Sequence, residues 1–329
     1  MLGVEASTLA PSRTFGDLEG HRRELTAYCY RMLGSPFEAE DAVQETLLRA
    51  WRALDRFEGR AQLRSWLYRI ATNVCLDMLS GRERRARPMD MSPARAPDGP
   101  VGEILPEVTW IEPVPDARVL PHDDPAAVAE SHETIRLAFV AALQHLPPRQ
   151  RAVLILREVL NWRATEVAEL LETTVPAVNS ALQRARAALE EADVADAGQG
   201  SLSEHDRELL TRYVDAFERY DMDALTALIH EDATQSMPPY EMWLRGREHI
   251  FGWWLGAGAA CRGSRVLPAS SANGSPAFGQ YRRSPDGSGY EPWALQVLEV
   301  AGGEIVELTF FLSTDRLFPL FGLPARLSA

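Results

Sequence analysis

The chain has 329 residues, which is long enough for two or three domains that each bury a core of their own. No stretch approaches the roughly 20 consecutive apolar residues that a membrane span needs, and the N-terminus lacks the apolar core of a signal peptide, so we expect a cytoplasmic protein. The three cysteines are widely separated, which argues against a disulfide framework or a zinc site, and no residue pattern indicates a metal or a cofactor.

The formal net charge of −13 hides an uneven distribution of charge along the chain. Residues 60–87 hold seven arginines against two acidic residues, whereas residues 90–133 hold ten acidic residues against two arginines. A local basic segment keeps nucleic-acid binding open even though the whole chain is acidic. Because all 34 basic residues are arginine, every phosphate contact would be made by arginine.

Residues 15–87 follow a loose N-terminal tail and are helical in pattern. The spacing of apolar residues predicts helices over residues 22–33, 39–54 and 63–79. The middle helix has one apolar side, to which we assign Trp51, and one largely exposed side. The exposed side suits docking to a basic or polar partner, although a face that only meets solvent has the same pattern. Its candidate contact residues are Asp41, Gln44 and Glu45.

Aromatic and basic side chains alternate from the end of the middle helix into the next one. Aromatic rings can stack on unpaired bases while arginines follow the phosphate backbone, so the pattern is typical of single-strand binding. Trp66 and Tyr68 fit a helical core equally well. The candidate nucleic-acid contacts in this segment are Phe57, Arg60, Arg64, Arg69, Asn73 and Arg82.

Residues 88–132 contain most of the acidic excess, and nine of the 22 prolines fall between residues 88 and 125. This composition predicts an extended linker rather than a packed element. An acidic, extended linker could follow a basic channel built for nucleic acid by mimicking its charge. A spacer without contacts is the alternative.

Residues 133–192 read as a second helical domain that contains a helix-turn-helix. A short helix over residues 166–171 and a polar turn precede Pro176, which suits the first turn of a new helix. In that helix Val178, Leu182, Ala185 and Leu189 form one inward stripe. Small and polar side chains on the other faces suit entry into a major groove, although an ordinary two-helix corner remains an alternative. The candidate DNA contacts are Ala177, Asn179, Ser180, Gln183 and Arg184.

Residues 203–329 change character from helices to strands. Helices are predicted over residues 203–220, 224–229 and 248–255, with the sequence His230-Glu231-Asp232 read as a helix end. Two strands, residues 294–300 and 305–312, flank a glycine turn and predict a hairpin. Helices followed by an antiparallel sheet indicate an α+β domain. The candidate pocket residues are Tyr213, Met237, Tyr240, Trp243, Trp253, Trp254 and Trp293.

Two separate motifs resemble the extracytoplasmic-function (ECF) sigma factors of RNA polymerase. Residues 36–79, with the sequences PFEAEDAVQET, FEGR and SWLYRIATNVCLD, resemble sigma region two. Residues 146–186, with LPPRQRAVL and VNSALQRAR, resemble sigma region four. The sequence WIEPVPD at residues 110–116 resembles a motif of those sigma factors that carry a C-terminal extension, and residues 203–329 resemble SnoaL-like relatives of ketosteroid isomerase.

This resemblance implies a fold and a set of partners. Two all-α domains, residues 15–87 and 133–192, would precede a cone-shaped SnoaL-like domain, residues 203–329, with a curved antiparallel sheet. The resemblance places the Asp41 face against the β′ clamp helices of the polymerase core, which also includes the β subunit. It places residues 57–62 at the melted −10 strand and the Asn179 face in the −35 major groove. The C-terminal domain could hold a small ligand.

The sequence therefore predicts a sigma factor that directs promoter-specific initiation, with its C-terminal domain regulating it by intramolecular contact. The aromatic stretch 237–254 and the apolar tail 317–324 are the candidate docking surfaces, unless the tail only completes its own core. Two alternatives stay open: a helix-turn-helix repressor with a ligand-sensing domain, and a SnoaL-like enzyme fused to a DNA-binding module. We expect no enzymatic activity, because no catalytic arrangement is evident among Asp221, Asp223, His230, Asp232 and His249.

Overall fold

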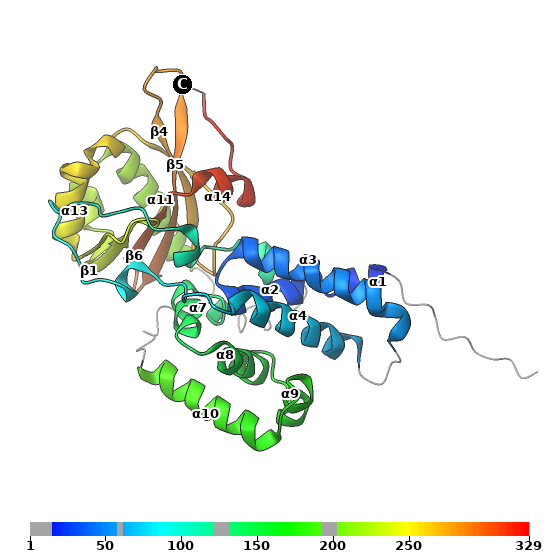
Figure 1. Cartoon of the computed structure of the whole chain (residues 1–329). Coiled ribbons are helices and arrows are strands. Elements are labelled where there is room, and N and C mark those ends of the chain that lie inside the picture. The colour runs from blue at the N-terminus through cyan, green and yellow to red at the C-terminus, as the bar shows by residue number, and fades with distance from the viewer. Residues whose placement is uncertain (1–14, 58–61, 122–131, 192–202, 329) are drawn as a thin grey trace, which may run out of the picture.

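Two helical domains and a sheet domain make up the computed structural model of the chain (Figure 1). The structure describes residues 15–57, 62–121, 132–191 and 203–328. The first helical domain consists of α1 (Phe15–Glu19), α2 (Arg22–Leu33), α3 (Pro36–Ala53) with the short 3-10 turn η1 (Leu54–Arg56), and α4 (Leu63–Leu79). The predicted bounds of α2 and α4 are confirmed, and α3 begins three residues earlier than expected.

Local chemistry explains the sharp corner between α2 and α3. Gly34 ends α2 in the left-handed region, at φ 73°, and its N–H donates to the Tyr30 carbonyl over 2.8 Å. Ser35 then caps α3 by accepting from the Glu38 N–H at 3.4 Å, and Pro36 occupies the first turn, where its missing N–H costs nothing. The corner brings α2, α3 and α4 together around a buried core that includes Tyr28, Leu47 and Leu67.

The second helical domain contains the predicted helix-turn-helix. Its elements are α7 (Leu137–Gln144), α8 (Pro148–Leu154), the π-helical turn η4 (Ile155–Val159), α9 (Ala164–Leu170) and α10 (Val175–Glu191). Val178, Leu182 and Ala185 are buried, as the inward stripe predicted. The domain lies directly against the first one, because α4 packs on α8 and α9.

The sheet domain is α+β with a mixed sheet. Its helices are α11 (Glu204–Arg219), α12 (Met222–Thr226), α13 (Arg247–Leu255), the 3-10 turn η5 (Ala257–Cys261) and α14 (Thr314–Leu320). Its strands are β1 (Ile229–Ser236), β2 (Trp243–Arg245), β3 (Arg265–Pro268), β4 (Ala277–Arg283), β5 (Tyr290–Ala301) and β6 (Glu304–Phe311). They lie in the order β2-β1-β6-β5-β4-β3. The predicted hairpin is confirmed as β5 and β6.

Two expectations for this domain were wrong. The sheet is not purely antiparallel, because β1 pairs parallel with β6 while the other neighbours are antiparallel. His230, Glu231 and Asp232 do not end a helix but belong to β1. These polar residues lie in a strand whose burial does not alternate cleanly, so the two-residue period that identifies a strand is missing.

The expectation of an unpacked linker was also wrong. Within residues 88–121 the chain forms η2 (Pro88–Asp90), η3 (Glu107–Thr109) and α5 (Asp116–Val119). Trp110, Ile111 and Val114 are buried, and the last two belong to the same core cluster as α2 and α4. Apolar side chains in the sequence WIEPVPD therefore attach a proline-rich, acidic segment to the first helical domain.

Candidate nucleic-acid interface

The outer face of α3 is polar along its first half. Asp41 and Gln44 are exposed, whereas Ala42 and Val43 point into the core. Glu45 is half-buried and accepts from Arg49 Nε at 2.6 Å, a pairing that raises the pKa of Arg49. The three predicted partner-binding residues therefore share one accessible stripe of the helix.

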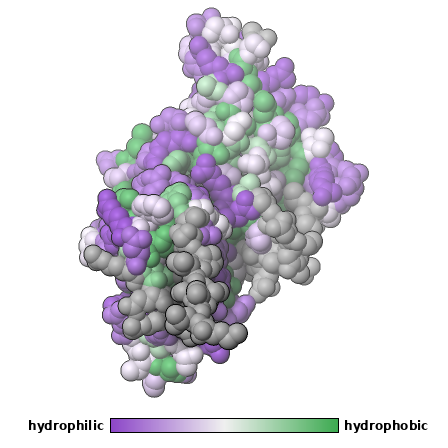
Figure 2. All heavy atoms as spheres, turned by 90° about the vertical axis from the view of Figure 1, so that its right-hand side faces the viewer, coloured by the Kyte–Doolittle hydropathy of each residue, from purple (hydrophilic) through white to green (hydrophobic). Residues whose placement is uncertain are grey.

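The same stripe continues into apolar residues that the sequence reasoning missed. Leu48 is 42% exposed and Trp51 is 49% exposed, although Trp51 was expected on the buried side. Phe15, at 45% exposure, meets Trp51 edge-on with 5.7 Å between the ring centres. Figure 2 shows the side of the molecule toward which α1 lies, where hydrophobic atoms reach the surface in small groups between hydrophilic ones. The i, i+3, i+4, i+7 spacing from Asp41 to Leu48 could have indicated this extension.

The candidate single-strand contacts near the start of α4 are already engaged within the chain. Arg64 Nε donates to Glu24 Oε2 over 2.7 Å, and its guanidinium lies 5.6 Å from the ring centre of Trp162 in the second helical domain. Phe57 packs against Trp66, with 4.7 Å between ring centres. Tyr68 is completely buried, so it belongs to the core rather than to a base-stacking surface.

Among the other candidate single-strand contacts, two arginines are bound to other residues of the chain and one asparagine is exposed. Arg69 donates to the Glu169 carbonyl of α9 over 3.0 Å, which joins the two helical domains. Arg82 donates to Glu38 Oε1 over 2.5 Å. Asn73 is exposed, and Arg60 lies outside the described residues.

The helix-turn-helix, in contrast, presents its predicted DNA-facing residues freely. Thr174 Oγ1 accepts from the Ala177 N–H at 3.3 Å and so caps the first turn of α10. The exposed side chains along the outer face of α10 are Ala177, Asn179, Ser180, Gln183 and Arg184. The helix therefore offers small and polar groups near its start, followed by an arginine, and within the described ranges no hydrogen bond or ion pair joins these five side chains to the first helical domain.

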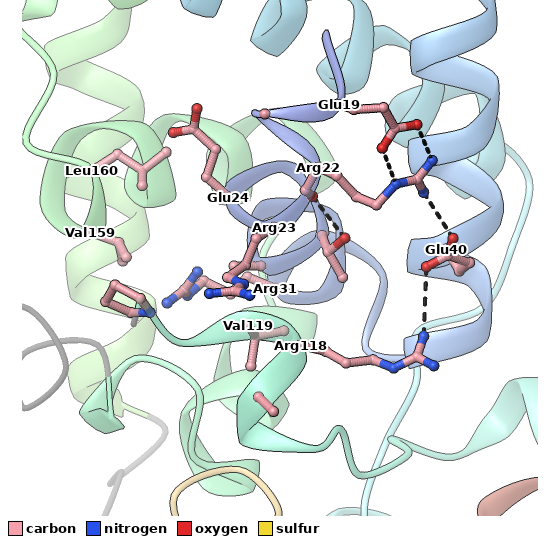
Figure 3. Close-up of a pocket in the computed structure, with 15 residues that line it drawn as sticks. Glu19, Arg22, Arg23, Glu24, Arg31, Glu40, Arg118, Val119, Val159 and Leu160 are labelled. Carbon is pink, nitrogen blue, oxygen red and sulfur yellow. Dashed lines mark hydrogen bonds and ion pairs between the residues drawn. The ribbon is translucent and has the colours of Figure 1, made fainter. Parts of the chain in front are cut away.

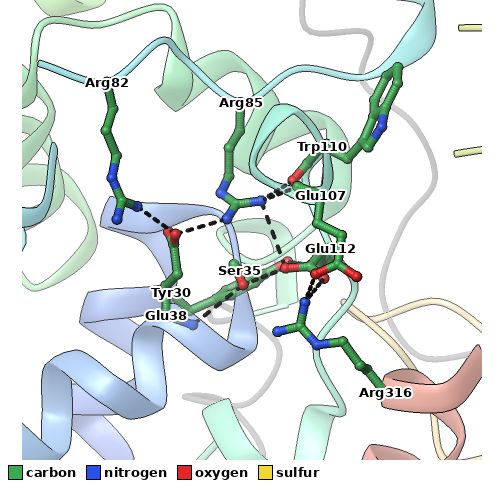
Figure 4. Close-up of polar contacts among 9 residues, drawn as sticks. All are labelled: Tyr30, Ser35, Glu38, Arg82, Arg85, Glu107, Trp110, Glu112 and Arg316. Atoms are coloured by element: carbon green, nitrogen blue, oxygen red, sulfur yellow. Dashed lines mark hydrogen bonds and ion pairs between the residues drawn. The ribbon is translucent and has the colours of Figure 1, made fainter. Parts of the chain in front are cut away.

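A buried ionic network joins the linker to the start of α3 (Figure 4). The Arg85 guanidinium is 3.1 Å from Glu38 and 3.7 Å from Glu112, and it also donates to the carbonyls of Glu107 and Trp110. Burial raises the pKa of the Glu112 carboxyl, although the hydrogen bond from the capping residue Ser35 opposes this shift. Ser35 and Arg85 together keep the Glu112 carboxylate in place.

Arg316 of α14 reaches this network from the sheet domain (Figure 4). It pairs with Glu107 and lies 3.8 Å from Glu112. Its guanidinium also lies 3.8 Å from the ring centre of Phe37 at the start of α3. Leu317 and Phe318 of the same helix are buried in the core cluster that also contains residues of α2 and α4, while α14 packs on β5 of its own domain.

Asn273 is a second point of contact between the domains. Its Nδ2 donates to Tyr30 Oη over 2.7 Å and to the Ile135 carbonyl over 2.5 Å, and its Oδ1 accepts from the Val114 N–H at 2.9 Å. These partners belong to the first helical domain, to the segment before α7, and to the linker. One buried amide in the sheet domain therefore contacts three other parts of the chain.

A cleft of about 810 Å³ lies between α2, α5 and η4 (Figure 3). Arg22 lies between Glu19 and Glu40, at 2.7 and 2.9 Å, and Arg118 approaches Glu40 to 3.7 Å from the linker. Burial lowers the pKa of Arg31 to about 10. Among these contacts, the Arg118–Glu40 ion pair joins the linker to the first helical domain.

The sheet domain contains a smaller cavity of about 220 Å³. Met237, Tyr240, Trp253, Trp254 and Trp293 line it, as predicted. Two predicted pocket residues lie elsewhere: Tyr213 is buried against Gln296, and Trp243 donates to the Ser92 carbonyl of the linker over 2.7 Å. The acidic and histidine side chains considered for catalysis do not line the cavity; they are Asp221, Asp223, His230, Asp232 and His249.

Comparison with known proteins decides the family. Family models match residues 18–85 as Sigma-70 region 2, residues 136–189 as Sigma-70 region 4 and residues 210–308 as a SnoaL-like domain. The chain is 46% identical over 317 residues to the ECF RNA polymerase sigma factor SigG of Mycobacterium tuberculosis H37Rv, covering 94% of this chain and 84% of SigG. The chain belongs to the ECF RNA polymerase sigma factors.

A further sigma factor and a solved structure are also similar to this chain. SigW of Bacillus subtilis is 31% identical over 169 residues, covering 51% of this chain and 82% of SigW. The crystal structure of M. tuberculosis SigJ superposes with a TM-score of 0.60 at 23% identity, covering 95% of this chain and all of SigJ, and so has the same fold. The predicted sigma-factor function is confirmed, and with it the RNA polymerase core and promoter DNA as partners.

The described part of this sigma factor has neither a membrane-spanning helix nor a metal-binding cluster. None of its described helices is long and apolar enough to cross a membrane. No group of three or more histidine, cysteine, aspartate or glutamate side chains in the described ranges could hold a metal ion.

Proposed function

We propose that the outer face of α3 docks on the clamp helices of the polymerase β′ subunit, with Asp41, Gln44 and Glu45 supplying its polar contacts. Leu48 and Trp51 extend the same stripe with exposed apolar area, which a partner would cover. A mixed surface of this kind suits a partner that is basic at one end and apolar at the other, because charge complementarity selects the partner and apolar burial stabilises the complex.

We assign promoter reading to two surfaces. The −10 strand is bound by the segment from Phe57 through α4, where the proposed contacts are Phe57, Arg60, Arg64, Arg69, Asn73 and Arg82. The −35 groove is read by α10, where the proposed contacts are Ala177, Asn179, Ser180, Gln183 and Arg184. The exposure of all five α10 residues supports the second assignment.

We infer that the observed arrangement of the domains is a closed, low-activity state of the sigma factor. The two promoter elements are about 25 base pairs apart, or roughly 85 Å at 3.4 Å per base pair. In this arrangement α4 packs against α8 and α9, and the Tyr68 and Trp162 rings are 5.1 Å apart. Domains in direct contact cannot span that distance, so initiation requires them to separate.

The observation that carries this proposal is Asn273, whose amide binds the first helical domain, the linker and the segment before α7 at once. A sheet domain held there opposes separation of the helical domains. Its role would be regulation by contact rather than catalysis. The positions of Asp221, Asp223, His230, Asp232 and His249 away from the cavity support a non-enzymatic role.

The test replaces Asn273 with glycine in the full chain. Asn273 has φ 54°, which glycine adopts without strain, so Asn273→Gly removes the amide and keeps the backbone. Each lost hydrogen bond is worth about 1 kcal/mol, so a several-fold rise in transcription with purified core polymerase is expected, at unchanged promoter choice. Asn161→Gly is the matched control, because Asn161 is exposed and has φ 55°. If Asn273→Gly and Asn161→Gly give the same amount of transcript, the contacts of Asn273 do not hold the sigma factor in a low-activity state.

A further inference from the structure

The cavity of the sheet domain is small, aromatic and partly covered by the linker. Its volume of about 220 Å³ lies below the roughly 300–1,000 Å³ of pockets for drug-sized ligands, which limits an occupant to one or two rings. Its aromatic walls are Phe217, Tyr220, Tyr240, Trp253, Trp254, Trp293 and Phe310. Flat aromatic side chains in this number favour a planar occupant, because rings stack or meet edge to face.

Arg282 is the charged residue among those that line the cavity. Its Nε donates to the Ala260 carbonyl over 3.1 Å, and its guanidinium lies 4.0 Å from the ring centre of Trp293. Among the described residues no carboxylate forms an ion pair with it. The guanidinium is therefore held in position by a carbonyl and a ring while its charge has no anionic partner from the described chain.

Gln235 supplies a second unused polar group. Its side chain is almost completely buried, at 1% exposure, and its Oε1 accepts from Trp254 Nε1 at 2.8 Å. Within the described part of the chain its amide NH₂ has no acceptor. Gln280 on the same cavity wall differs, because its Nε2 donates to Ser264 and its Oε1 accepts from Gln296, each at 3.0 Å. The Gln235 amide nitrogen is not among the described side-chain atoms that are fully enclosed without a partner, so it keeps access to the cavity, where a ligand or a water molecule can accept its hydrogen bond.

We propose that this cavity binds a small aromatic carboxylate. The ring lies among the tryptophans, Arg282 binds the carboxylate, and the Gln235 amide donates to an acceptor atom of the ligand. Val101 of the linker also lines the cavity, next to a linker segment held to this domain by the hydrogen bond from Leu105 N–H to the Pro239 carbonyl at 3.0 Å. The binding site therefore includes the linker, and its test does not depend on the proposed regulation.

The experiment measures binding of 2-naphthoate and of its neutral analogue 2-naphthamide to the full chain by isothermal titration calorimetry. Wild type should bind 2-naphthoate about tenfold or more tighter than 2-naphthamide, since hydrogen bonds to a charged group are the stronger kind. Arg282→Met should abolish that preference while 2-naphthamide binds as before, which shows that the cavity is intact. Arg283→Met is the matched control, because Arg283 is the next residue of β4 and does not line the cavity.

Val101→Ser tests the part played by the linker. It should weaken both probes alike, by a few-fold, because it removes apolar contact without changing the charge at Arg282. Failure of both probes to bind wild type, equal affinity for the two probes, or an unchanged preference in Arg282→Met would overturn the proposal. Unchanged affinities in Val101→Ser would remove the linker from the site.

Discussion

Removing the Arg316 guanidinium should loosen the contact between the sheet domain and the start of α3. Arg316 pairs with Glu107 at partly exposed positions, 33% and 47%, where an ion pair is worth about 0.2–1 kcal/mol. Its contact with the Phe37 ring, at 3.8 Å, adds about 0.5–1 kcal/mol. Together these contacts favour the closed state by about 0.7–2 kcal/mol, so Arg316→Ala should raise the open population about 3–30-fold.

The assay is equilibrium binding of the full chain to fluorescently labelled core polymerase, followed by transcription from one promoter with the same protein. Arg316→Ala should bind core more tightly and give more transcript at limiting protein. Arg326→Ala is the control, because Arg326 is exposed and pairs with Glu291 at 2.7 Å within the sheet domain. If Arg316→Ala and Arg326→Ala bind core with the same affinity, α14 does not restrain the helical domains and the reasoning fails.

Three further predictions test other surfaces of the molecule. Replacing Asp41 and Glu45 together with arginine should lower core affinity roughly a thousandfold through like-charge contact, measured by co-purification with core, while the melting temperature stays within a few degrees. Arg184→Ala should weaken binding to the −35 element by about 1–3 kcal/mol, measured by footprinting, while the affinity for core stays unchanged. An unaltered −35 footprint would show that another face of the protein reads this element. Burial raises the pKa of Glu299 to about 7 from 4.5, so its contribution to stability is complete below pH 4.5 and is lost as the pH rises toward 7. Glu299→Gln should flatten the melting temperature between pH 4.5 and 7, whereas Glu291→Gln should leave the wild-type slope; a wild-type slope in both would refute this assignment.

Elements with a clean period were predictable from sequence, and those that depend on distant partners were not. Helices α2 and α4 have the predicted bounds because their apolar residues repeat at helical spacing, and Gly34 marks the end of α2. The β5–β6 hairpin is a local pairing across a glycine turn. Strand β1, in contrast, pairs parallel with β6 about 70 residues away, and no local pattern specifies such a pairing.

The candidate sites show the same division. The outer face of α10 follows from helical periodicity alone, since its neighbours on the helix are buried. For Arg64 and Arg69 the sequence identifies basic residues but cannot indicate that Glu24 and the Glu169 carbonyl already contact them. The acidic linker was predicted from composition to be an extended segment rather than a packed element. The segment is nevertheless packed, because Trp110 and Ile111 are buried and a few apolar side chains are enough to order a short segment whose overall composition is polar.

The hydrogen bonds of Arg69 and Arg84 have a consequence for counterions. Arg69 donates to the Glu169 carbonyl, and Arg84 donates to the His145 imidazole, whose pKa is lowered by burial and by the Arg84 charge, so that the ring stays a neutral acceptor. Both acceptors belong to the second helical domain, so in this arrangement neither arginine is free to displace cations from a phosphate. Each arginine that binds a phosphate of the −10 single strand after opening steepens the logarithmic salt dependence of binding by about 0.7. Two released arginines would therefore raise the exponent of the salt concentration in the binding constant by about 1.4.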